Sequence, residues 1–504
     1  MSATSDIARP EATGWGAGSV AGTGLERNAV GGIEVFAQGI AAAAPSVAVA
    51  VVPAQIFLVA GAGSIWSAAL GGALVLLVAY LISLHARRTV SAGSLGTYVG
   101  NGLGPGAAFA TGWGLLIGYT GFAVGGLFGG VLYFSDLLHQ FGIDTSSQPA
   151  RLGVLAAVAA AAIILPYRGV RLSARSALII ELLSILAISI IFVATLYQFG
   201  WQIDWPQFDT QNFALNTLLI GGVLSVGSYA GFESVASLGL EARNPHRTIA
   251  KVVVRTVLLL AAVYLVATYT EVLSFSHGPN QLNPDTAPLP IVAANANVSW
   301  VVFLIDIGIG ISMVAFAAAV ISAGARSLFT LASEGAVPHV FARTHGKFHS
   351  PHVGVVTIGL IALALGIIGT LSSVGRLLFE TYLGIVATWG YLTSYLLVAI
   401  ATPLYLKRIH ALTPVSLLAS LATIAAVLFV IYNNLIPVPA WPFNVLPYAF
   451  LGLLILGLTR YWYLLATDPA RARRVGELQE LSEEEVERLT TLGVHPRPAA
   501  TPAQ

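Results

Sequence analysis

Residues 227–233 read GSYAGFE and interrupt an apolar run that extends from about residue 214 to about residue 239. In hydrocarbon every backbone polar group needs a partner, so a helix broken at membrane depth is tolerated only where it is buried in protein or lines a cavity. This interruption, in the sixth apolar run of the chain, therefore marks a place to look for a binding site.

A second interruption lies in the first apolar run, where residues 39–47 read GIAAAAPSV. Pro45 lacks an amide hydrogen and fits the first position of a helix, so it can begin a second half-helix whose free amides, at Ser46 and Val47, point into the break. Such amides, together with the positive end of the helix dipole, suit a carboxylate. For this run taken alone, a proline kink in an ordinary packed helix is an alternative. Two interruptions at similar depth favour a binding site.

The composition around these breaks is that of a membrane protein. The chain has 504 residues, of which 56% are hydrophobic and only 9% are charged, whereas a soluble domain carries about 25% charged residues. Apolar runs of about 20 residues, long enough to cross a bilayer, recur along it. We therefore predict an all-α integral membrane protein of about twelve transmembrane helices. The predicted spans lie near residues 34–58, 64–84, 106–134, 152–167, 175–199, 214–239, 252–274, 300–330, 353–372, 377–403, 413–432 and 443–465.

The basic residues predict how the chain lies in the membrane. With this span count, every Lys and Arg other than Arg151 and Arg376 falls on one side, which the positive-inside rule assigns to the cytoplasm. We expect a multi-pass protein of the plasma (inner) membrane with both termini cytoplasmic. The first 30 residues do not resemble a signal peptide, so the first span is expected to direct insertion.

Three regions follow from this topology. We predict a cytoplasmic N-terminal tail at 1–33, a transmembrane domain at 34–465 and a cytoplasmic C-terminal tail at 466–504. Within the last, Ser482 with Glu485 three positions on resembles a helix start and predicts a short charged helix. The membrane domain is expected to be complete by Tyr463, so that deletion after about residue 470 leaves transport largely unchanged.

Several functional classes are disfavoured. The net charge of +1, with no long basic face, gives no reason to expect nucleic acid as a partner. The chain has no cysteine, which excludes disulfides, thiolate metal sites and thiol nucleophiles. The spans hold no His/Asp/Glu cluster spaced for catalysis or metal binding, so we expect neither an enzyme nor a cofactor or metal. Membrane lipid and a small-molecule substrate are the expected partners.

Three ordered motifs carry a resemblance to a known family. Residues 228–249 read SYAGFESVASLGLEARNPHRTI and resemble the sixth-helix signature of the amino acid-polyamine-organocation superfamily of permeases, in which Gly-Phe-Glu precedes an acidic-x-x-Asn-Pro-x-Arg run. Residues 91–99, SAGSLGTYV, followed by Gly112 and Trp113, agree with it, as do residues 326–338, RSLFTLASEGAVP. The chain therefore resembles the bacterial-type amino acid transporters of this superfamily along most of its membrane region.

The resemblance implies a fold and a function. The fold would be the LeuT-like five-plus-five inverted repeat, in which spans 1 and 6 are broken and the site lies between them at mid-membrane. The function would be secondary active transport of an amino acid. The first break departs from the family, since many members carry a Gly-Ser/Thr-Gly triplet where this chain has Pro45-Ser46-Val47.

The same resemblance predicts the residues of the substrate site. The substrate's carboxylate would meet Ser46 and Val47, and its amino group would meet carbonyls of the two breaks. The predicted substrate-binding residues are Ala42, Ala43, Ser46, Val47, Ser228, Tyr229, Ala230, Gly231, Phe232, Trp113 and Trp389. Tyr119 and Met313 are expected to line the same space.

Three polar residues are candidates for coupling transport to an ion gradient. Glu233 falls in the first turn of the second half of span 6, where the helix dipole favours its charge, and its expected role is to hold the break. Glu181 lies one turn before Ser184 on the same face of span 5. Some bacterial relatives have a lysine near Ser184 that is linked to proton coupling, which this chain lacks. We expect Glu181 to pack or hydrogen-bond within span 5, with proton carriage as the alternative.

The side chains around the breaks predict the charge of the substrate. A cationic substrate needs acidic ligands at membrane depth. Glu233 is the one carboxylate expected near the breaks, so neutral amino acids fit the site best. A polyamine or cationic amino acid transporter or exchanger is the alternative, and a solute sensor or a channel is an alternative of a different class. The coupling ion, H⁺ or Na⁺, and the choice between symport and exchange stay open.

Overall fold

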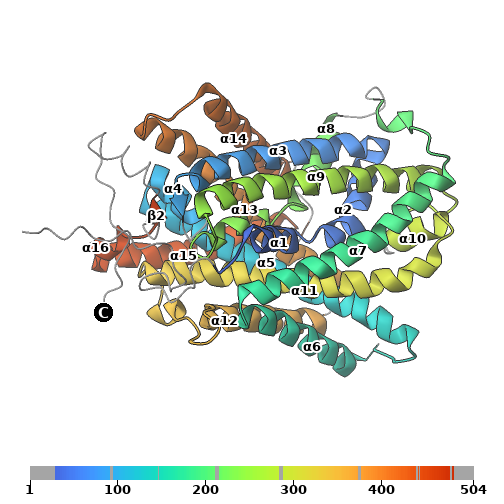
Figure 1. The fold of residues 1–504 in the computed structure, drawn as a ribbon, viewed down its shortest axis with the longest axis horizontal. Helices are drawn as coiled ribbons and strands as arrows, with labels where there is room; N and C mark the ends of the chain where they lie inside the picture. Colours follow the sequence, from blue (N-terminus) through green and yellow to red (C-terminus); the bar gives the residue numbers. More distant parts are fainter. Residues whose placement is uncertain are drawn as a thin grey trace, which may run out of the picture.

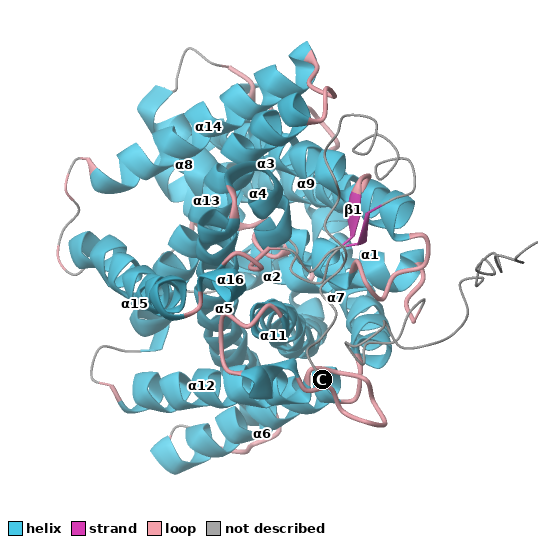
Figure 2. Ribbon diagram, turned by 90° about the vertical axis from the view of Figure 1, so that its left-hand side faces the viewer, coloured by secondary structure: helices cyan, strands magenta, loops and turns pink. Residues whose placement is uncertain are grey.

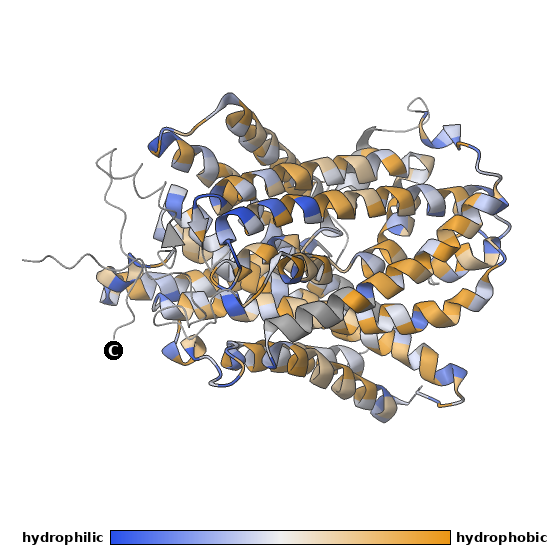
Figure 3. Cartoon of the chain, in the orientation of Figure 1, coloured by the Kyte–Doolittle hydropathy of each residue, from blue (hydrophilic) through white to orange (hydrophobic). Residues whose placement is uncertain are grey.

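The chain folds as a bundle of long helices (Figure 1). The structure is a computed structural model that describes residues 29–90, 95–145, 147–209, 215–282, 288–372, 376–436, 438, 441, 443–476 and 480–481. Hydrophilic residues gather at the two ends of the bundle and apolar residues cover the helices between them (Figure 3). This distribution is the one that a bilayer requires.

The described residues contain eleven segments long and apolar enough to cross a membrane. The interrupted sixth span adds a twelfth; its two pieces are each too short to be counted as a continuous span. The spans in order are α1 (Gly32–Ala43) with α2 (Pro45–Ala60), α3 (Ser64–Ala86), α5 (Pro105–Gln140), α6 (Gln148–Tyr167), α7 (Val170–Gln198), α8 (Leu215–Gly227) with η4 (Phe232–Leu238), α9 (Pro245–His277), α11 (Val302–Ser333), α12 (His352–Leu371), α13 (Arg376–Arg408), α14 (Pro414–Leu435) and α15 (Leu446–Thr467).

The predicted fold class is therefore confirmed, and each predicted span overlaps a helix of the structure. The main difference is in length, because α5, α9 and α11 have 36, 33 and 32 residues. At 1.5 Å per residue such helices exceed the roughly 30 Å of the hydrocarbon core. Their ends therefore reach beyond the apolar layer, into regions that hydropathy alone does not assign to a span.

Helix packing repeats after five spans. Spans 2, 3 and 4 pack against spans 7, 8 and 9, as the pairs α3 with α9, α5 with α11, and α6 with α12. Two further kinds of contact occur in matching pairs: α5 packs against α13 as α11 packs against α7, and α3 packs against α8 as α9 packs against α2. Figure 2 shows α5 and α11 near the middle of the bundle. Exchange of spans 1–5 with spans 6–10 thus preserves these contacts, as a five-plus-five repeat requires.

Very small residues let the broken spans approach their neighbours closely. A Cβ on Gly39 of α1 would meet Val235 of η4 and Thr256 of α9 at 2.5 and 3.0 Å. In the first half of span 6, a Cβ on Gly71 of α3 would run into Ser225, and a Cβ on Gly221 of α8 would run into Ser67. Small side chains at such contacts allow backbones to pack tightly in membranes. Both broken spans are therefore fixed by close contact on more than one side.

Several short elements were not predicted. They are α4 (Leu95–Leu103), α10 (Pro288–Asn295), α16 (Pro469–Ala472) and an antiparallel pair of two-residue strands, β1 (Thr89–Val90) and β2 (Glu480–Leu481). The strand pair joins the segment after span 2 to the C-terminal tail, at the end of the bundle that carries α4 and α16 (Figure 1). The helix predicted to begin at Ser482 lies outside the described residues.

The packed part of the C-terminal region extends past Tyr463. Ala472 and Val475 are buried in one apolar cluster with Phe109 and Leu328. Packing against the ends of other helices therefore continues past Tyr463, while the end of the membrane domain near residue 465 stays a prediction. Hydropathy places the end of the last span correctly but carries no information on a short segment that packs against the ends of other helices.

Candidate functional site

The first span is broken at Ala44. This residue adopts the left-handed conformation, with φ 43° and ψ 65°, and its N–H donates to Ile40 O at 2.8 Å to end α1. A left-handed alanine costs about 1–2 kcal/mol, and such strain is typical of functional sites. Pro45 begins α2 without an amide hydrogen, so Ala41 O lacks the N–H that a continuous helix would supply. The break exposes backbone groups to neighbouring spans.

The sixth span is broken between α8 and η4, over residues 228–231. Gly231 has φ 103°, a value that favours glycine, and it precedes the first turn of η4. The carbonyl of Ser228 accepts a hydrogen bond from the Tyr264 hydroxyl of α9 at 2.8 Å. The Tyr229 ring lies edge-on to Tyr264, with ring centroids 4.9 Å apart. The break is therefore fixed to span 7 by a hydrogen bond and a ring contact.

The two breaks lie directly against each other. A Cβ built on Gly231 would run into the Ala42 carbonyl group, so the backbone of span 6 reaches the end of α1 without an intervening side chain. Ala42 also packs in a small apolar cluster with Ala315 and Ala319 of α11. The two interruptions that the sequence predicts to form one site are thus brought together, beside span 8.

Glu181 of α7 reaches the first break. Its Oε1 accepts the Ser46 N–H at 2.6 Å, and its Oε2 accepts the Ser46 and Ser312 hydroxyls at 3.2 and 2.8 Å. Ser184, one turn further along α7, lies 3.1 Å from the Ser312 hydroxyl. All four residues are buried. The Glu181 carboxylate therefore links span 5 to spans 1 and 8, and it accepts a backbone N–H at the start of α2.

This contact changes the expected set of acidic residues. Sequence analysis predicts Glu233 as the one carboxylate near the breaks, whereas in the structure Glu181 also contacts the first break. Ala42 O would accept the Ser46 N–H in a continuous helix, but that N–H donates to Glu181 instead. Two acidic side chains, one from span 5 and one from span 6, therefore lie at the breaks.

The Glu233 side chain, at the start of η4, stabilises the break of the sixth span. Its Oε2 accepts the Gly231 N–H at 3.1 Å, and its carboxylate also accepts the hydroxyls of Tyr119 and Tyr395, at 3.1 and 2.9 Å. Glu233 is fully buried. It thereby links the break to α5 and α13, an arrangement in which the carboxylate stabilises the backbone of the break.

The structure gathers most of the predicted site residues around the breaks. Ala42, Ala43, Ser46, Ser228, Tyr229, Gly231 and Phe232 are buried there, while Val47 and Ala230 are partly exposed. Met313 packs on Gly126 and Gly129 of α5, next along α11 from Ser312.

Two predicted residues lie elsewhere. The Trp113 indole donates from Nε1 to Leu453 O of α15 at 3.0 Å. Trp389 stacks on Phe450 of α15, with ring centroids 6.4 Å apart. The structure therefore does not bring these tryptophans to the breaks; both face the last span.

Sequence reasoning missed three residues of the site. They are Ser312, which binds Glu181, Tyr395, which binds Glu233, and Tyr264, which binds the Ser228 carbonyl. A polar residue inside an apolar run is the signal that could have found them. That signal is weak for hydroxyl residues, because a Ser or Tyr in a membrane helix often bonds only its own backbone or lies at an interface.

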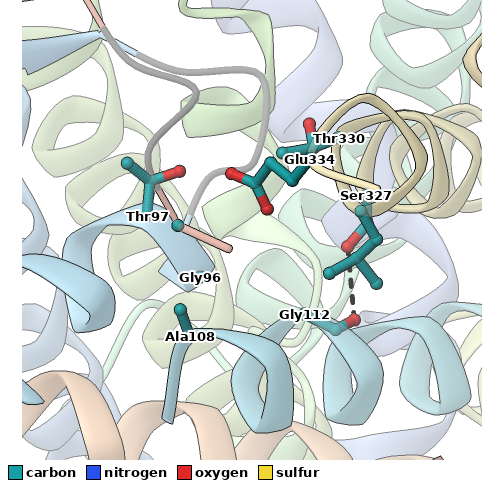
Figure 4. Close-up of a pocket in the computed structure, with 9 residues that line it drawn as sticks. Gly96, Thr97, Ala108, Gly112, Ser327, Thr330 and Glu334 are labelled. Carbon is teal, nitrogen blue, oxygen red and sulfur yellow. Dashed lines mark hydrogen bonds between the residues drawn. The ribbon is translucent and has the colours of Figure 1, made fainter. Parts of the chain in front are cut away.

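A pocket lies away from the breaks, between residues of the second and third sequence motifs. It is a small, partly open pocket between α4, α5, the end of α11 and Gly476 of the C-terminal region (Figure 4). Thr97, Ser327, Thr330 and Glu334 line it, and Ser327 donates to Gly112 O at 3.2 Å. Residues of the second and third motifs thus meet here, at the start of span 3 and the end of span 8. This contact is separate from the candidate site.

The comparisons with known proteins identify the family. A model of the amino acid permease family matches residues 28–458. The chain belongs to the amino acid permease family. Membership bears out the amino acid-polyamine-organocation superfamily resemblance and the LeuT-like fold with its broken spans 1 and 6. It also indicates a multi-pass membrane protein with a small-molecule substrate.

Individual relatives of this permease are distant. It is 25% identical to the branched-chain amino acid permease BcaP of Bacillus subtilis (strain 168), over 71% of this chain and 78% of that one. It is 26% identical to the vacuolar cationic amino acid transporter 2 of Arabidopsis thaliana, over 59% of this chain and about half (49%) of that one. The methylthioribose transporter of Bacillus subtilis is 24% identical, over 65% of this chain and 73% of that one. The names of these relatives describe transport rather than catalysis.

One solved structure aligns with much of the chain. A Na⁺-coupled sialic acid symporter, in a substrate-bound outward-open state, aligns with a TM-score of 0.49 and 12% identity, over 79% of this chain and 89% of that one.

Proposed function

We propose that this permease is a secondary active transporter that moves neutral amino acids across the plasma membrane by alternating access. The observation that supports this most directly is the contact of the two breaks, where Gly231 lies against Ala42. In this fold a site between two discontinuous helices can be opened to one side of the membrane and then to the other. The transport would proceed without an enzymatic step, and both termini would lie in the cytoplasm.

The backbone of the breaks can hold the charged groups of an amino acid. The substrate's carboxylate would accept N–H groups of Ser46 and Val47 at the positive end of α2, and its ammonium would donate to the carbonyls of Ala42, Ala43 and Ala230. Tyr229 and Phe232, buried aromatic residues of the sixth-span break, would supply apolar surface for the side chain of the substrate. The branched-chain substrate named for the relative BcaP fits the same chemistry.

A cationic substrate is the second candidate, because a specific observation favours it. Glu181 and Glu233 both lie at the breaks, and ammonium groups need acidic partners at membrane depth. Both carboxylates are, however, already satisfied by three hydrogen bonds each, and Glu233 bonds the backbone of its own break. We therefore give the neutral substrate precedence over a polyamine or a cationic amino acid.

The proposal is tested by transport in proteoliposomes that contain the purified full chain. Labelled leucine, alanine, phenylalanine, lysine, arginine and putrescine are offered in turn, in the presence and absence of proton and sodium gradients. We expect saturable uptake of the neutral amino acids and little of the cations. A sensor would bind without flux, and a channel would give flux that does not saturate or accumulate substrate.

Bulky substitutions at the breaks test the position of the site. Ser46→Trp and Gly231→Trp should abolish uptake while the protein still reaches the membrane. Leu418→Trp is the control, since Leu418 of α14 is exposed on the outside of the bundle. Normal transport by the two break variants would place the site elsewhere.

A further inference from the structure

A carboxylate of the chain itself lies where the proposed function puts the carboxylate of the substrate. Glu181 Oε1 accepts the Ser46 N–H at 2.6 Å, at the start of α2. Val47, the next amide, is partly exposed, whereas Ser46 and Glu181 are buried. A substrate carboxylate that bonds both amides must therefore first displace Glu181 from one of them.

Among the described residues, no group that hydrogen-bonds to Glu181 carries a positive charge that could hold two carboxylates together. Its hydrogen-bond partners are the Ser46 amide and the hydroxyls of Ser46 and Ser312. The titratable group that faces it from span 7 is the Tyr264 hydroxyl, which is neutral and donates to Ser228 O. Within the described residues, α1, α2, α6, α10 and α11 bring no charged side chain into hydrogen-bond contact with it.

Two ionised carboxylates cannot share these donors. Like charges a few ångströms apart repel strongly in a buried site, as paired carboxylates that share one proton show. If Glu181 binds a proton on Oε2, its O–H can donate to the Ser312 hydroxyl, and Oε1 becomes a neutral carbonyl oxygen that accepts the Ser46 N–H more weakly than a carboxylate does. A substrate carboxylate can then displace it from that N–H. The neutral side chain then no longer opposes a second carboxylate.

We propose that the Glu181 carboxylate competes with the substrate's carboxylate for the Ser46 N–H. The substrate therefore binds together with one proton, which neutralises Glu181. The inference rests on the proposed function and assigns H⁺ as the coupling ion. The proton comes from water on the side to which the site is open and adds to one carboxylate oxygen of Glu181. No other covalent bond changes. When the substrate leaves on the other side, Glu181 returns its proton to the water there and accepts the Ser46 N–H again.

The first test measures protons directly on the wild-type chain. Purified protein in weakly buffered detergent solution is mixed with leucine, and a pH dye reports protons taken up. We expect up to one proton per bound leucine. In parallel, the dissociation constant for leucine should rise by up to about tenfold per pH unit in the range where Glu181 is ionised in the empty site. Binding that takes up no proton and does not change with pH would overturn the proposal.

The second test uses Glu181→Gln, which keeps the shape of the side chain but cannot be ionised. This variant should bind leucine with an affinity that is independent of pH, and it should still exchange leucine across the membrane. It should lose at least tenfold of the accumulation driven by an imposed proton gradient. The wild-type proton measurement decides the question if this variant does not fold.

Glu271→Gln is the matched control. Glu271 is a buried carboxyl of α9, and neither of its carboxylate oxygens has a hydrogen-bond partner in the described part of the chain. We expect this variant to keep both the pH dependence and the gradient-driven accumulation. If Glu271→Gln loses them and Glu181→Gln does not, the proposal is wrong.

The outcomes separate this inference from the proposed function. If the wild type exchanges no neutral amino acid at any pH, the proposed function fails. If it exchanges them and pH has no effect on binding, only the role of Glu181 fails. If amines without a carboxylate bind in their place and Glu181→Gln abolishes that binding, Glu181 is a ligand for the substrate's ammonium, which would also overturn the proposal.

Discussion

Arg326 and Glu241 form a buried ion pair with two hydrogen bonds, from Nε to Oε2 at 2.8 Å and from Nη2 to Oε1 at 3.1 Å. Arg326 begins the third sequence motif and lies on α11, and Glu241 is the acidic residue of the motif that follows η4. The Glu241 carbonyl also accepts the Val30 N–H at 3.1 Å. The pair thus fixes the chain after span 6 to span 8 and, through Val30, to the segment before α1.

Removing one partner of this pair should destabilise the folded protein far more than removing both. Arg326→Leu leaves the Glu241 carboxylate buried and without its countercharge, so we expect it to lower the free energy of unfolding by about 3–5 kcal/mol. Arg326→Leu combined with Glu241→Leu replaces the pair by apolar groups and should recover most of that loss. Denaturant unfolding of the purified protein in detergent measures both. Equal loss in the single and double variants would contradict this account.

An exposed ion pair provides the control for that experiment. Arg471 and Asp468 lie 3.5 Å apart with both side chains largely exposed. Asp468→Asn removes the charge but keeps an oxygen that can accept the Arg471 N–H at the start of α16. We expect a change of less than about 1 kcal/mol, as is usual for surface pairs.

The contact of the two breaks predicts a sharp steric effect at Gly231. Ala at this position has to adopt a left-handed backbone and also places a methyl group against the Ala42 carbonyl. Gly231→Ala should therefore force the breaks apart and reduce the rate of leucine uptake at least tenfold. Gly452→Ala on α15, where a Cβ meets nothing within 4 Å, should transport normally. Normal uptake by Gly231→Ala would show that close contact of the breaks is not needed for transport.

The breaks could be predicted from the sequence because proline and glycine act locally. Pro45 cannot donate a backbone hydrogen bond, and Gly231 allows a positive φ, so each limits the chain at its own position. The contact of Glu181 with Ser46 joins residues 135 positions apart. Helical periodicity gives the face on which a side chain lies, but it does not tell which other span that face meets. This is why the sequence favoured a role for Glu181 within its own span.

The two tryptophans also show that a sequence does not determine which distant span a side chain contacts. Trp113 follows a recognisable motif, and the family resemblance predicts it in the substrate site. Its side chain nevertheless turns toward α15, where the absence of a side chain on Gly457 leaves room for the indole ring. A large aromatic residue follows the space available to it, and that space depends on packing between distant spans.

The C-terminal region gives a prediction that differs from the sequence-based one. Deletion of residues 471–504 removes Ala472 and Val475, which are buried against Phe109 and Leu328. We expect this truncation to lose about 2–3 kcal/mol of stability through lost apolar burial. Deletion of residues 482–504 keeps the buried segment and the β1–β2 pair and should leave stability and uptake unchanged. Thermal unfolding of the two truncations, measured side by side, tests this; equal stability would contradict it.

The last prediction concerns the role of Glu233. Its carboxylate accepts the Gly231 N–H and the hydroxyls of Tyr119 and Tyr395, so every described hydrogen bond of this side chain supports the break or a neighbouring span. A carboxylate that stabilises the backbone should matter for the working shape of the site, whereas a ligand for a cation should determine which substrates bind.

Glu233→Gln separates these roles. The amide keeps one oxygen for the Gly231 N–H but cannot accept both tyrosine hydroxyls at full strength, because a neutral acceptor forms weaker hydrogen bonds than a carboxylate. We expect a loss of about 1–3 kcal/mol in stability and a lower maximal rate of leucine uptake, with the order of competitors unchanged. Tyr395→Phe removes one of the same hydrogen bonds without altering charge, and it should give a smaller change in the same direction. If Glu233→Gln instead weakened inhibition by lysine and putrescine while leucine bound as before, Glu233 would be a ligand for positively charged substrates, and neutral amino acids would not be the main cargo.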